Sequence, residues 1–380
     1  LGYSPVQLAF LFLFYEFFGV LTNFLGGWIG SRMGLRITLF AGLATQIGAL
    51  LMLSGLQESW GVAYSVMYVM AAQAVSGIAK DLTKMSAKSA VKVVVASGEE
   101  RRLFKWVAVL TGSKNALKGV GFFLGGFLLE RWGFVPTLYG MAGMLGAVLL
   151  VGLVGIRQDL GKAKVKVKFR HLFAKRREIN VLSGARLFLF GARDLWFVVG
   201  LPVFLIETMG WRFTAVGGFL AAWVIGYGMV QAVAPAVVRQ SGAAGAAKAA
   251  VLWSGVLLVV TAAIALCVQI DFCPEAVVLG GLGVFGVVFA INSAVHSYLI
   301  LAYTDTDQVA VDVGFYYMAN ATGRLVGTLG SGVAYVVGGL SACLWCAAAF
   351  VLLGLAVSLR LPRSTAARRR DVGRGMSRLS

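Results

Sequence analysis

Acidic side chains are scarce in this sequence of 380 residues, which carries 16 Asp and Glu against 34 Lys and Arg. Only two histidines are present, His171 and His296, and no spacing of nucleophile, base and carboxylate indicates a hydrolase or transferase site. The phosphate-binding pattern Gly-x-x-x-x-Gly-Lys-Ser/Thr is missing. ATP-driven transport is therefore not expected of this chain, a membrane-embedded enzyme is only a remote alternative, and no cofactor or metal is expected.

Charge of either sign is also scarce, at 13% of residues against roughly 25% in soluble domains. Hydrophobic residues make up 59% of the chain. Because about 20 apolar residues cross a bilayer as a helix, this composition predicts an all-α polytopic membrane protein. We predict eleven membrane-spanning helices, near residues 6–30, 35–53, 63–79, 106–129, 136–156, 181–205, 213–238, 249–270, 276–299, 313–337 and 341–360.

The net charge of +18 is concentrated between the predicted helices. Of the 34 Lys and Arg residues, 27 lie in five segments that alternate along the chain, at 30–36, 80–105, 157–178, 239–248 and 360–380. Cytoplasmic loops of membrane proteins carry such an excess of basic residues. We therefore expect these segments and the C-terminus on the cytoplasmic side, with the bilayer and not a nucleic acid as the partner of the chain.

The longest polar stretch between helices, at 157–180, divides the chain into two halves. Residues 1–156 form a half with five predicted helices, and 181–360 form a half with six, followed by a basic tail at 361–380. The sequence begins with Leu-Gly-Tyr-Ser-Pro and without methionine. We expect one further helix to precede it, which would make eleven visible helices of twelve.

An internal repeat supports this division. "KGVGFFLGG" from Lys118 aligns with "RLVGTLGSG" from Arg324 at an offset of 206 residues. Parallel six-helix repeats around a site at the membrane midplane are the arrangement of major facilitator transporters. "GWIGSRMGLR" resembles the gating-loop signature of that superfamily, with Ser31 where the family usually has Asp. The positions that fit the signature are Gly27, Arg32, Gly34 and Arg36.

Charged residues inside the predicted helices are candidates for function, because a Lys or Arg at the bilayer centre costs about 2.5–3.5 kcal/mol on insertion scales. The five cations are Lys114, Lys118, Arg186, Arg193 and Arg324. Two carboxylates accompany them, Glu16 and Asp194, which leaves an excess of three positive charges. If these helices converge on a cavity, an anion is the missing partner, and the amides of Asn115 and Asn320 could complete its site.

Structural alternatives stay open for each of these residues. Lys114 could reach toward the cytoplasmic end of its helix, Arg186 could anchor a helix end, and Arg193 could form a structural ion pair with Asp194. Lys80, Lys84, Lys88 and Lys92 recur every four residues and are interpreted as a solvated stripe facing lipid headgroups, with an entry funnel for anions as the alternative. The side chains of Asn115 and Asn320 could instead form hydrogen bonds between helices.

Longer segments resemble the ArsJ-type organoarsenical efflux permeases of the major facilitator superfamily. They include "WVAVLTGSKNALKGVGFFLGGFLL" and "ARLFLFGARDLWFVVGLPVFL". The resemblance implies a transporter of the bacterial inner membrane that exports 1-arseno-3-phosphoglycerate and so confers arsenate resistance. Glyceraldehyde-3-phosphate dehydrogenase would supply this substrate without forming a stable complex. Export of another sugar phosphate or organic anion is the alternative, and proton exchange through Glu16 or Asp194 is a hypothesis for its energy source.

Overall fold

The computed structural model describes residues 13–57, 59–96, 98–156, 176–238 and 242–362, and these contain helices and no strand. The first group of helices comprises α2 (Leu13–Met33), α3 (Leu35–Ser54), α4 (Val62–Val94), α5 (Glu100–Trp132) and α6 (Phe134–Gly155). The second group comprises α7 (Arg177–Phe197), α8 (Gly200–Glu207), α9 (Phe213–Val237), α10 (Gly242–Gln269), α11 (Pro274–Tyr303), the short 3₁₀ turn η2 (Thr306–Gln308) and α12 (Val309–Ser358).

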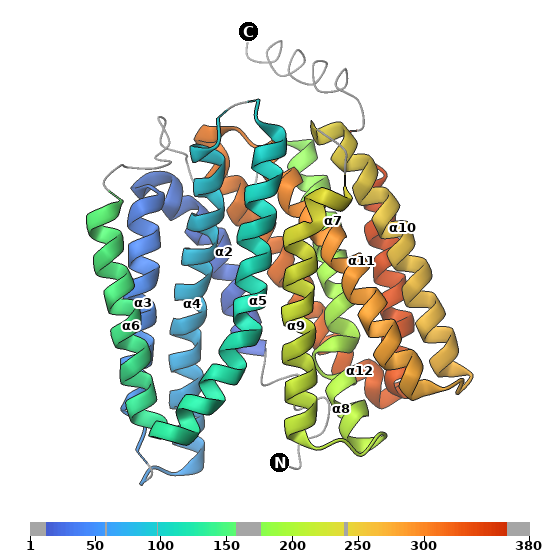
Figure 1. The fold of residues 1–380 in the computed structure, drawn as a ribbon, viewed down its shortest axis with the longest axis horizontal. Coiled ribbons are helices and arrows are strands. Elements are labelled where there is room, and N and C mark those ends of the chain that lie inside the picture. Colours follow the sequence, from blue (N-terminus) through green and yellow to red (C-terminus); the bar gives the residue numbers. More distant parts are fainter. Residues whose placement is uncertain (1–12, 58, 97, 157–175, 239–241, 363–380) are drawn as a thin grey trace.

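The two groups lie side by side with their helices roughly parallel (Figure 1). They meet where α5 packs against α9 and where α2 packs against α12. The end of the molecule that holds the α2–α3 and α4–α5 connections is called the basic end, after Arg32, Arg36, Arg101 and Arg102. The end that holds the α5–α6 and α10–α11 connections is called the opposite end.

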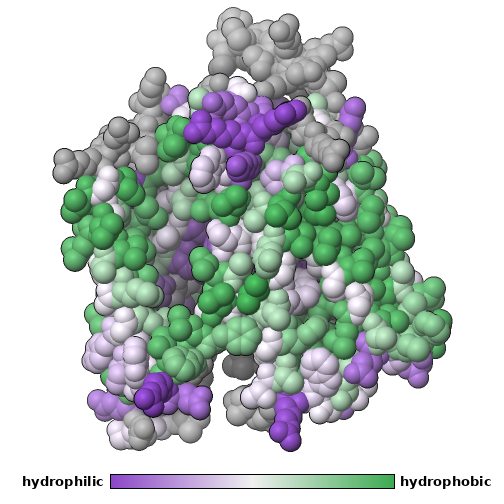
Figure 2. All heavy atoms as spheres, in the orientation of Figure 1, coloured by the Kyte–Doolittle hydropathy of each residue, from purple (hydrophilic) through white to green (hydrophobic). Residues whose placement is uncertain are grey.

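The outer surface is that of a membrane protein. Seven of the described helical segments are long and apolar enough to cross a bilayer, and large apolar side chains such as Val151, Val154 and Val259 are exposed on them. Hydrophobic residues cover much of the middle of the face in Figure 2, and hydrophilic residues gather toward its two ends. Every predicted apolar run falls at least partly in a described helix, while the count of eleven membrane-spanning helices stays a prediction.

Some breaks between helices lie at glycines, and another lies beside the cavity described below. Gly34 separates α2 from α3 with φ 92°, a conformation that favours glycine because it has no Cβ. Within α12 the backbone leaves the helical region at Gly338 and Gly339, so two helices follow one another there, as the gap between the apolar runs at 313–337 and 341–360 predicts. The break between α7 and α8 falls at Val198 and Val199.

Packing between the two groups differs at the two ends. One buried core at the basic end combines side chains of both groups, with Phe104 of α5 against Tyr298 of α11 at 4.9 Å between ring centroids. The second large core, toward the opposite end, is built from residues of the second group, such as Trp196 and Phe285. The structure therefore joins its two groups at the basic end and leaves space between them farther along.

The predicted segment boundaries remain predictions, since most of the linker and tail lie outside the described residues. Within the linker predicted at 157–180, residues 157–175 are not described, and α7 already begins at Arg177. Residues 363–380 of the predicted tail are likewise not described.

Candidate functional site

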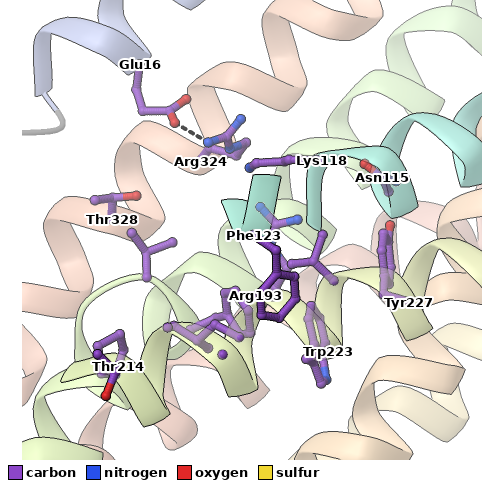
Figure 3. Close-up of a pocket in the computed structure, with 18 of the residues that line it drawn as sticks. Glu16, Asn115, Lys118, Phe123, Arg193, Thr214, Trp223, Tyr227, Arg324 and Thr328 are labelled. Atoms are coloured by element: carbon purple, nitrogen blue, oxygen red, sulfur yellow. Dashed lines mark hydrogen bonds and ion pairs between the residues drawn. The ribbon is translucent and has the colours of Figure 1, made fainter. Parts of the chain in front are cut away.

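A cavity of about 850 Å³ lies between the two groups of helices. The first group contributes side chains of α2, α4 and α5, and the second group contributes those of α7, α8, α9 and α12. Figure 3 shows side chains of both groups around the cavity, among them Glu16, Lys118 and Arg324, which gather on one side of it. The polar and charged residues of the wall are Glu16, Gln73, Ser76, Asn115, Lys118, Arg193, Thr214, Tyr227, Arg324 and Thr328.

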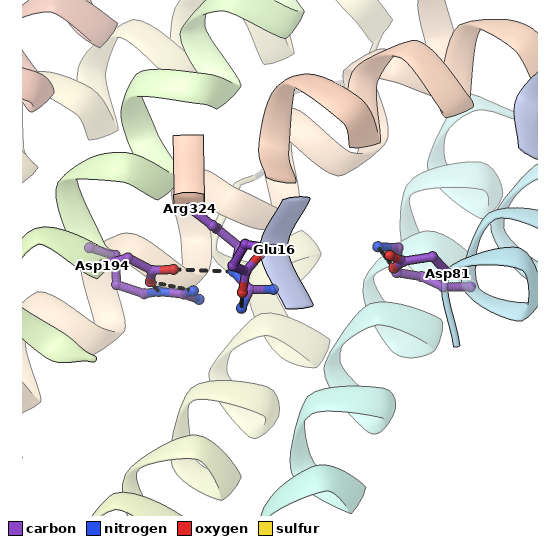
Figure 4. A network of polar contacts seen from close by, with 6 residues as sticks. Glu16, Asp81, Asp194 and Arg324 are labelled. Atoms are coloured by element: carbon purple, nitrogen blue, oxygen red, sulfur yellow. Dashed lines mark hydrogen bonds and ion pairs between the residues drawn. The ribbon is translucent and has the colours of Figure 1, made fainter. Parts of the chain in front are cut away.

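Four charged residues form one network in the wall of the cavity. Arg324 of α12 donates through Nη2 to Glu16 of α2, and through Nε to Oδ2 of Asp194 on α7 at 3.1 Å. The other oxygen of Asp194 accepts from Arg193, at 2.5 Å from Nη2 and 2.6 Å from Nε. Figure 4 shows Arg324 between the two carboxylates. Because Asp194 is 0% exposed, its charge is held by these two guanidinium groups and not by water.

The excess of positive charge at the cavity is smaller than the sequence predicts. Lys118 lies beside Arg324 in the wall (Figure 3), so the cavity and its network hold three cations against two carboxylates, a net charge of +1. Among the described residues, Lys114, Arg186 and Asn320 are not in this wall. The predicted excess of three charges in a single site is wrong for this cavity, because two of the five cations lie elsewhere.

Aromatic side chains form part of the cavity surface, which is called the aromatic wall. Phe197 packs on Trp223 with ring centroids 4.5 Å apart, and Trp223 stacks on Tyr227 at 5.6 Å and 10° between ring planes. The Trp223 indole donates to the carbonyl of Leu282 at 2.9 Å, which fixes the ring in place. Phe123 of α5 also lines the cavity (Figure 3). The cavity can thus contact an anionic group and an apolar carbon skeleton at the same time.

A chain of hydrogen bonds leads from the cavity toward the basic end. Asn115 donates to Gln231 of α9 at 2.7 Å, and Gln231 donates to the hydroxyl of Ser293 on α11 at 3.2 Å. The same hydroxyl accepts from Arg186 at 3.0 Å, and Arg186 also donates to Asn320 at 3.0 Å. Arg186 is therefore a buried residue, 3% exposed, joined to the cavity through neutral groups.

The gating-loop residues lie together at the turn between α2 and α3. The Ser31 hydroxyl donates to the carbonyl of Trp28 at 2.7 Å, and the Arg32 guanidinium lies 4.5 Å from the Trp28 ring centroid. Arg36 donates a hydrogen bond of 3.5 Å to the carbonyl of Leu153, which lies near the end of α6. Gly27 lies against the backbone of α12, where an added Cβ would come within 3.1 Å of the Gly314 Cα. This segment therefore sits where the two groups meet.

The interpretation of the α4 lysines as a solvated stripe is wrong for two of them. Lys88 is 1% exposed, and Lys84, with 15% of its side chain exposed, binds Asp81 at 2.6 Å. The Lys84 ammonium also lies 4.2 Å from the ring centroid of Tyr317. A period of four residues places side chains on one face of a helix but does not reveal whether lipid headgroups or a second helix cover that face.

Several residues of the cavity were not predicted from the sequence. Phe123, Phe197 and Trp223 look like ordinary apolar residues in the sequence, and no spacing marks them. Gln231 and Tyr227 are different, because the sequence marks them as polar groups that could complete a cavity. Tyr227 lines the cavity, and Gln231 accepts a hydrogen bond from Asn115 of its wall. Among the described residues, no group of three or more His, Cys, Asp or Glu side chains could hold a metal ion.

A family model matches the sequence, and solved structures match the fold. Residues 1–298 match the family described as Major Facilitator Superfamily. The fold is similar to that of the human organic anion transporter MFSD10 (TETRAN), with a TM-score of 0.73, 17% identity and coverage of 91% of this chain and 83% of that chain. No curated protein matches the sequence.

Two further solved structures are similar at low sequence identity. A bacterial homologue of the iron transporter ferroportin in its outward-facing state has a TM-score of 0.74 at 17% identity, over 95% of this chain and 91% of that chain. The proton:xylose symporter XylE, bound to 6-bromo-6-deoxy-D-glucose, has a TM-score of 0.74 at 11% identity, over 93% of this chain and 86% of that chain. At these identities the likenesses concern the fold alone.

Proposed function

Because the chain belongs to the major facilitator superfamily, a membrane transporter family, we propose that it is a secondary transporter that exports a small organic anion by alternating access. The observation that supports this proposal most directly is that Lys118 of α5 and Arg324 of α12, which belong to different groups of helices, line the same cavity. A substrate bound between them would contact both moving parts. Superfamily members bind substrate at such a position between repeats.

The specific substrate that we propose is 1-arseno-3-phosphoglycerate. This compound carries a phosphate and an arsenate group on a short carbon chain, and guanidinium and ammonium groups are the usual partners of such oxyanions in proteins. Its binding would require rearrangement of the network, since Glu16 and Asp194 already occupy donors of Arg193 and Arg324. We propose that substrate oxygens replace one of these carboxylates as the partner of an arginine.

Replacement of a carboxylate by substrate at an arginine would also allow export to be coupled to proton uptake. A carboxylate released from Arg324 faces the cavity without its cation, and a proton from the outside would neutralise it. Glu16 is the better placed of the two acids, because it lines the cavity while Asp194 is held by two arginines. We therefore propose Glu16 as the proton carrier and the bacterial inner membrane as the location, with the basic end and the C-terminus in the cytoplasm.

The aromatic wall favours a second candidate, an exporter of an organic anion with a larger apolar part. Phe197, Trp223 and Tyr227 present ring surface to the cavity, and a phosphorylated three-carbon acid has little apolar surface to cover it. This candidate uses the same cations and the same alternating access, so it differs from the first only in the substrate.

Arsenic accumulation in arsenate-sensitive cells tests the proposal and separates the two candidates. The protein is expressed with and without glyceraldehyde-3-phosphate dehydrogenase, as wild type, as Lys118→Ala and as Lys248→Ala, a lysine of α10 outside the cavity wall. We expect accumulation to fall only when both proteins are present, and the effect to be lost in Lys118→Ala alone. No change of accumulation in any strain would exclude the organoarsenical substrate and favour the second candidate.

A further inference from the structure

Lys88 is a buried ammonium group that no described side chain neutralises. It lies near the end of α4 at the basic end, is 1% exposed, and its Nζ has no hydrogen-bond partner among the described residues. The rings of Tyr316 and Tyr317 on α12 face it, with centroids 5.4 and 5.2 Å away. Contacts with aromatic rings offset only part of the free-energy cost of burying an ion.

A second buried cation lies against the same ring. The guanidinium carbon of Arg186 on α7 is 5.1 Å from the centroid of Tyr316. Arg186 donates hydrogen bonds to Asn320 and Ser293, which are neutral. The charged groups that act most strongly on Lys88 are Arg186, Lys114 and Lys84, all of them cations. Two positive charges therefore lie against one tyrosine ring in a buried region, and neither forms a salt bridge with a carboxylate of the described residues.

Neutral polar groups without partners accompany these cations. Both ring nitrogens of His296 and the hydroxyl of Ser183 are buried and lack hydrogen bonds to the described residues. Ser183 stands one turn before Arg186 on α7, and His296 stands one turn after Ser293 on α11. Buried polar groups in proteins almost always have a partner, and bound ions are one class of partner. A region rich in donors and in positive charge selects an anion.

We propose that Lys88 and Arg186 bind a small inorganic oxyanion, of the class of phosphate, between α4, α7, α11 and α12. The planar guanidinium offers paired donors to an oxyanion, and the ammonium adds a point charge. Since Lys88 belongs to the first group of helices and Arg186 to the second, the bound anion holds the two groups together at the basic end. It thereby favours the conformation in which this end is closed.

This site is distinct from the transport cavity, although the chain through Asn115, Gln231 and Ser293 connects the two. The inference does not rest on the proposed substrate. A protein that transports another anion would have the same two buried cations, and a failure of the transport experiment leaves this site untouched.

Thermal unfolding of the purified protein in detergent tests the site. Sodium phosphate is compared with sodium gluconate and sodium chloride at constant ionic strength, for the wild type, Lys88→Met and the cavity variant Lys118→Met. We expect phosphate to raise the unfolding temperature of the wild type and of Lys118→Met by several degrees in a saturable manner, and not that of Lys88→Met. In gluconate, Lys88→Met should unfold at a higher temperature than the wild type, because the uncompensated charge is gone.

Three results would overturn the proposal: an undiminished phosphate effect in Lys88→Met, loss of the effect in Lys118→Met, or an equal effect of chloride. Binding of radiolabelled phosphate to the wild type provides a readout that does not depend on the folding of any variant. One saturable site per chain is expected, and it should persist in Lys118→Met. The absence of saturable binding would contradict the site directly.

Discussion

Arg324 and Glu16 form an ion pair that joins the two groups of helices across the cavity. Glu16 lies on α2 and is 4% exposed, while Arg324 lies on α12 and also binds Asp194 of its own group at 3.1 Å. The pair is therefore both part of the cavity wall and a contact between the two groups of helices. In the alternating access that we propose, a ligand that competes for Arg324 would weaken this contact and so link substrate binding to movement.

Asp194→Asn should lower stability strongly. The substitution leaves Arg193 and part of Arg324 without their carboxylate in a buried position, and breaking such a group typically costs about 3–5 kcal/mol. We expect a clear fall of the unfolding temperature in detergent. Glu99→Gln is the matched control, because the Glu99–Arg102 pair at 3.0 Å is exposed and such pairs contribute about 0–1 kcal/mol. Equal effects of the two substitutions would contradict a buried network that stabilises the fold.

Glu16→Gln should separate transport from its energy source. The amide can still accept a hydrogen bond from Arg324 but cannot carry a proton. We expect the variant to transport down a substrate gradient in proteoliposomes and to show no stimulation by a pH gradient. Glu130→Gln, at an exposed position near the end of α5, should respond to the gradient like the wild type. Full stimulation of Glu16→Gln would remove Glu16 from the coupling mechanism.

Gly112→Ala should disturb the contact between α5 and α9. A Cβ at this position would lie 2.5 Å from the carbonyl oxygen of Gly228 and 2.7 Å from the amide nitrogen of Ala232, so the helices would have to separate. Overpacking of this kind costs typically 1–3 kcal/mol. Gly121→Ala on the same helix is the control, since a Cβ there meets no atom within 4 Å. We expect lower stability and transport for Gly112→Ala alone, measured by thermal unfolding and substrate flux.

Tyr298→Phe should open the basic end more often. The hydroxyl of Tyr298 on α11 donates to Glu100 on α5 and so links the two groups of helices there. A hydrogen bond to a charged group contributes about 1.5–3 kcal/mol, so its loss should raise the population of the open state roughly tenfold or more. Maleimide labelling of a cysteine placed at the buried position Ala108, in a protein without its native cysteines, reports this opening.

The control for this labelling experiment is Tyr139→Phe, since Tyr139 is an exposed residue of α6. It should leave the labelling rate at Ala108 unchanged. An equal rate in Tyr298→Phe and the wild type would show that the link to Glu100 does not hold the basic end closed.

Much of the fold was predictable because its signals are local. Apolar runs of about 20 residues predict the helices, and the glycines at 338 and 339 separate the last two runs where α12 breaks. The adjacency of Arg193 and Asp194 in the sequence also indicated their ion pair, which is confirmed. The pairing of Glu16 with Arg324 could not be predicted from spacing, since 308 residues separate them and only the packing of α2 against α12 brings them together.

The candidate site was predictable only in part for the same reason. A charged residue inside an apolar helix costs free energy to bury, and this criterion selected Lys118, Arg193 and Arg324 as candidates. All three line one cavity. The same criterion could not tell that Arg186 lies outside the cavity wall, because depth along a helix does not specify the direction of a side chain. Lys88 was missed because its period of four with Lys84 and Lys92 is equally typical of a helix face turned to lipid headgroups.

Distances across the two ends of the protein test alternating access most directly. Spin labels are placed at the exposed positions Arg102 and Arg177 at the basic end, and at Arg131 and Arg212 at the opposite end, and distance distributions are measured with and without the organic anion 3-phosphoglycerate. We predict that a population with a longer distance at the basic end appears together with a shorter distance at the opposite end. Distances that stay fixed at both ends, or that lengthen at both ends together, would contradict a transporter whose two halves move around this cavity.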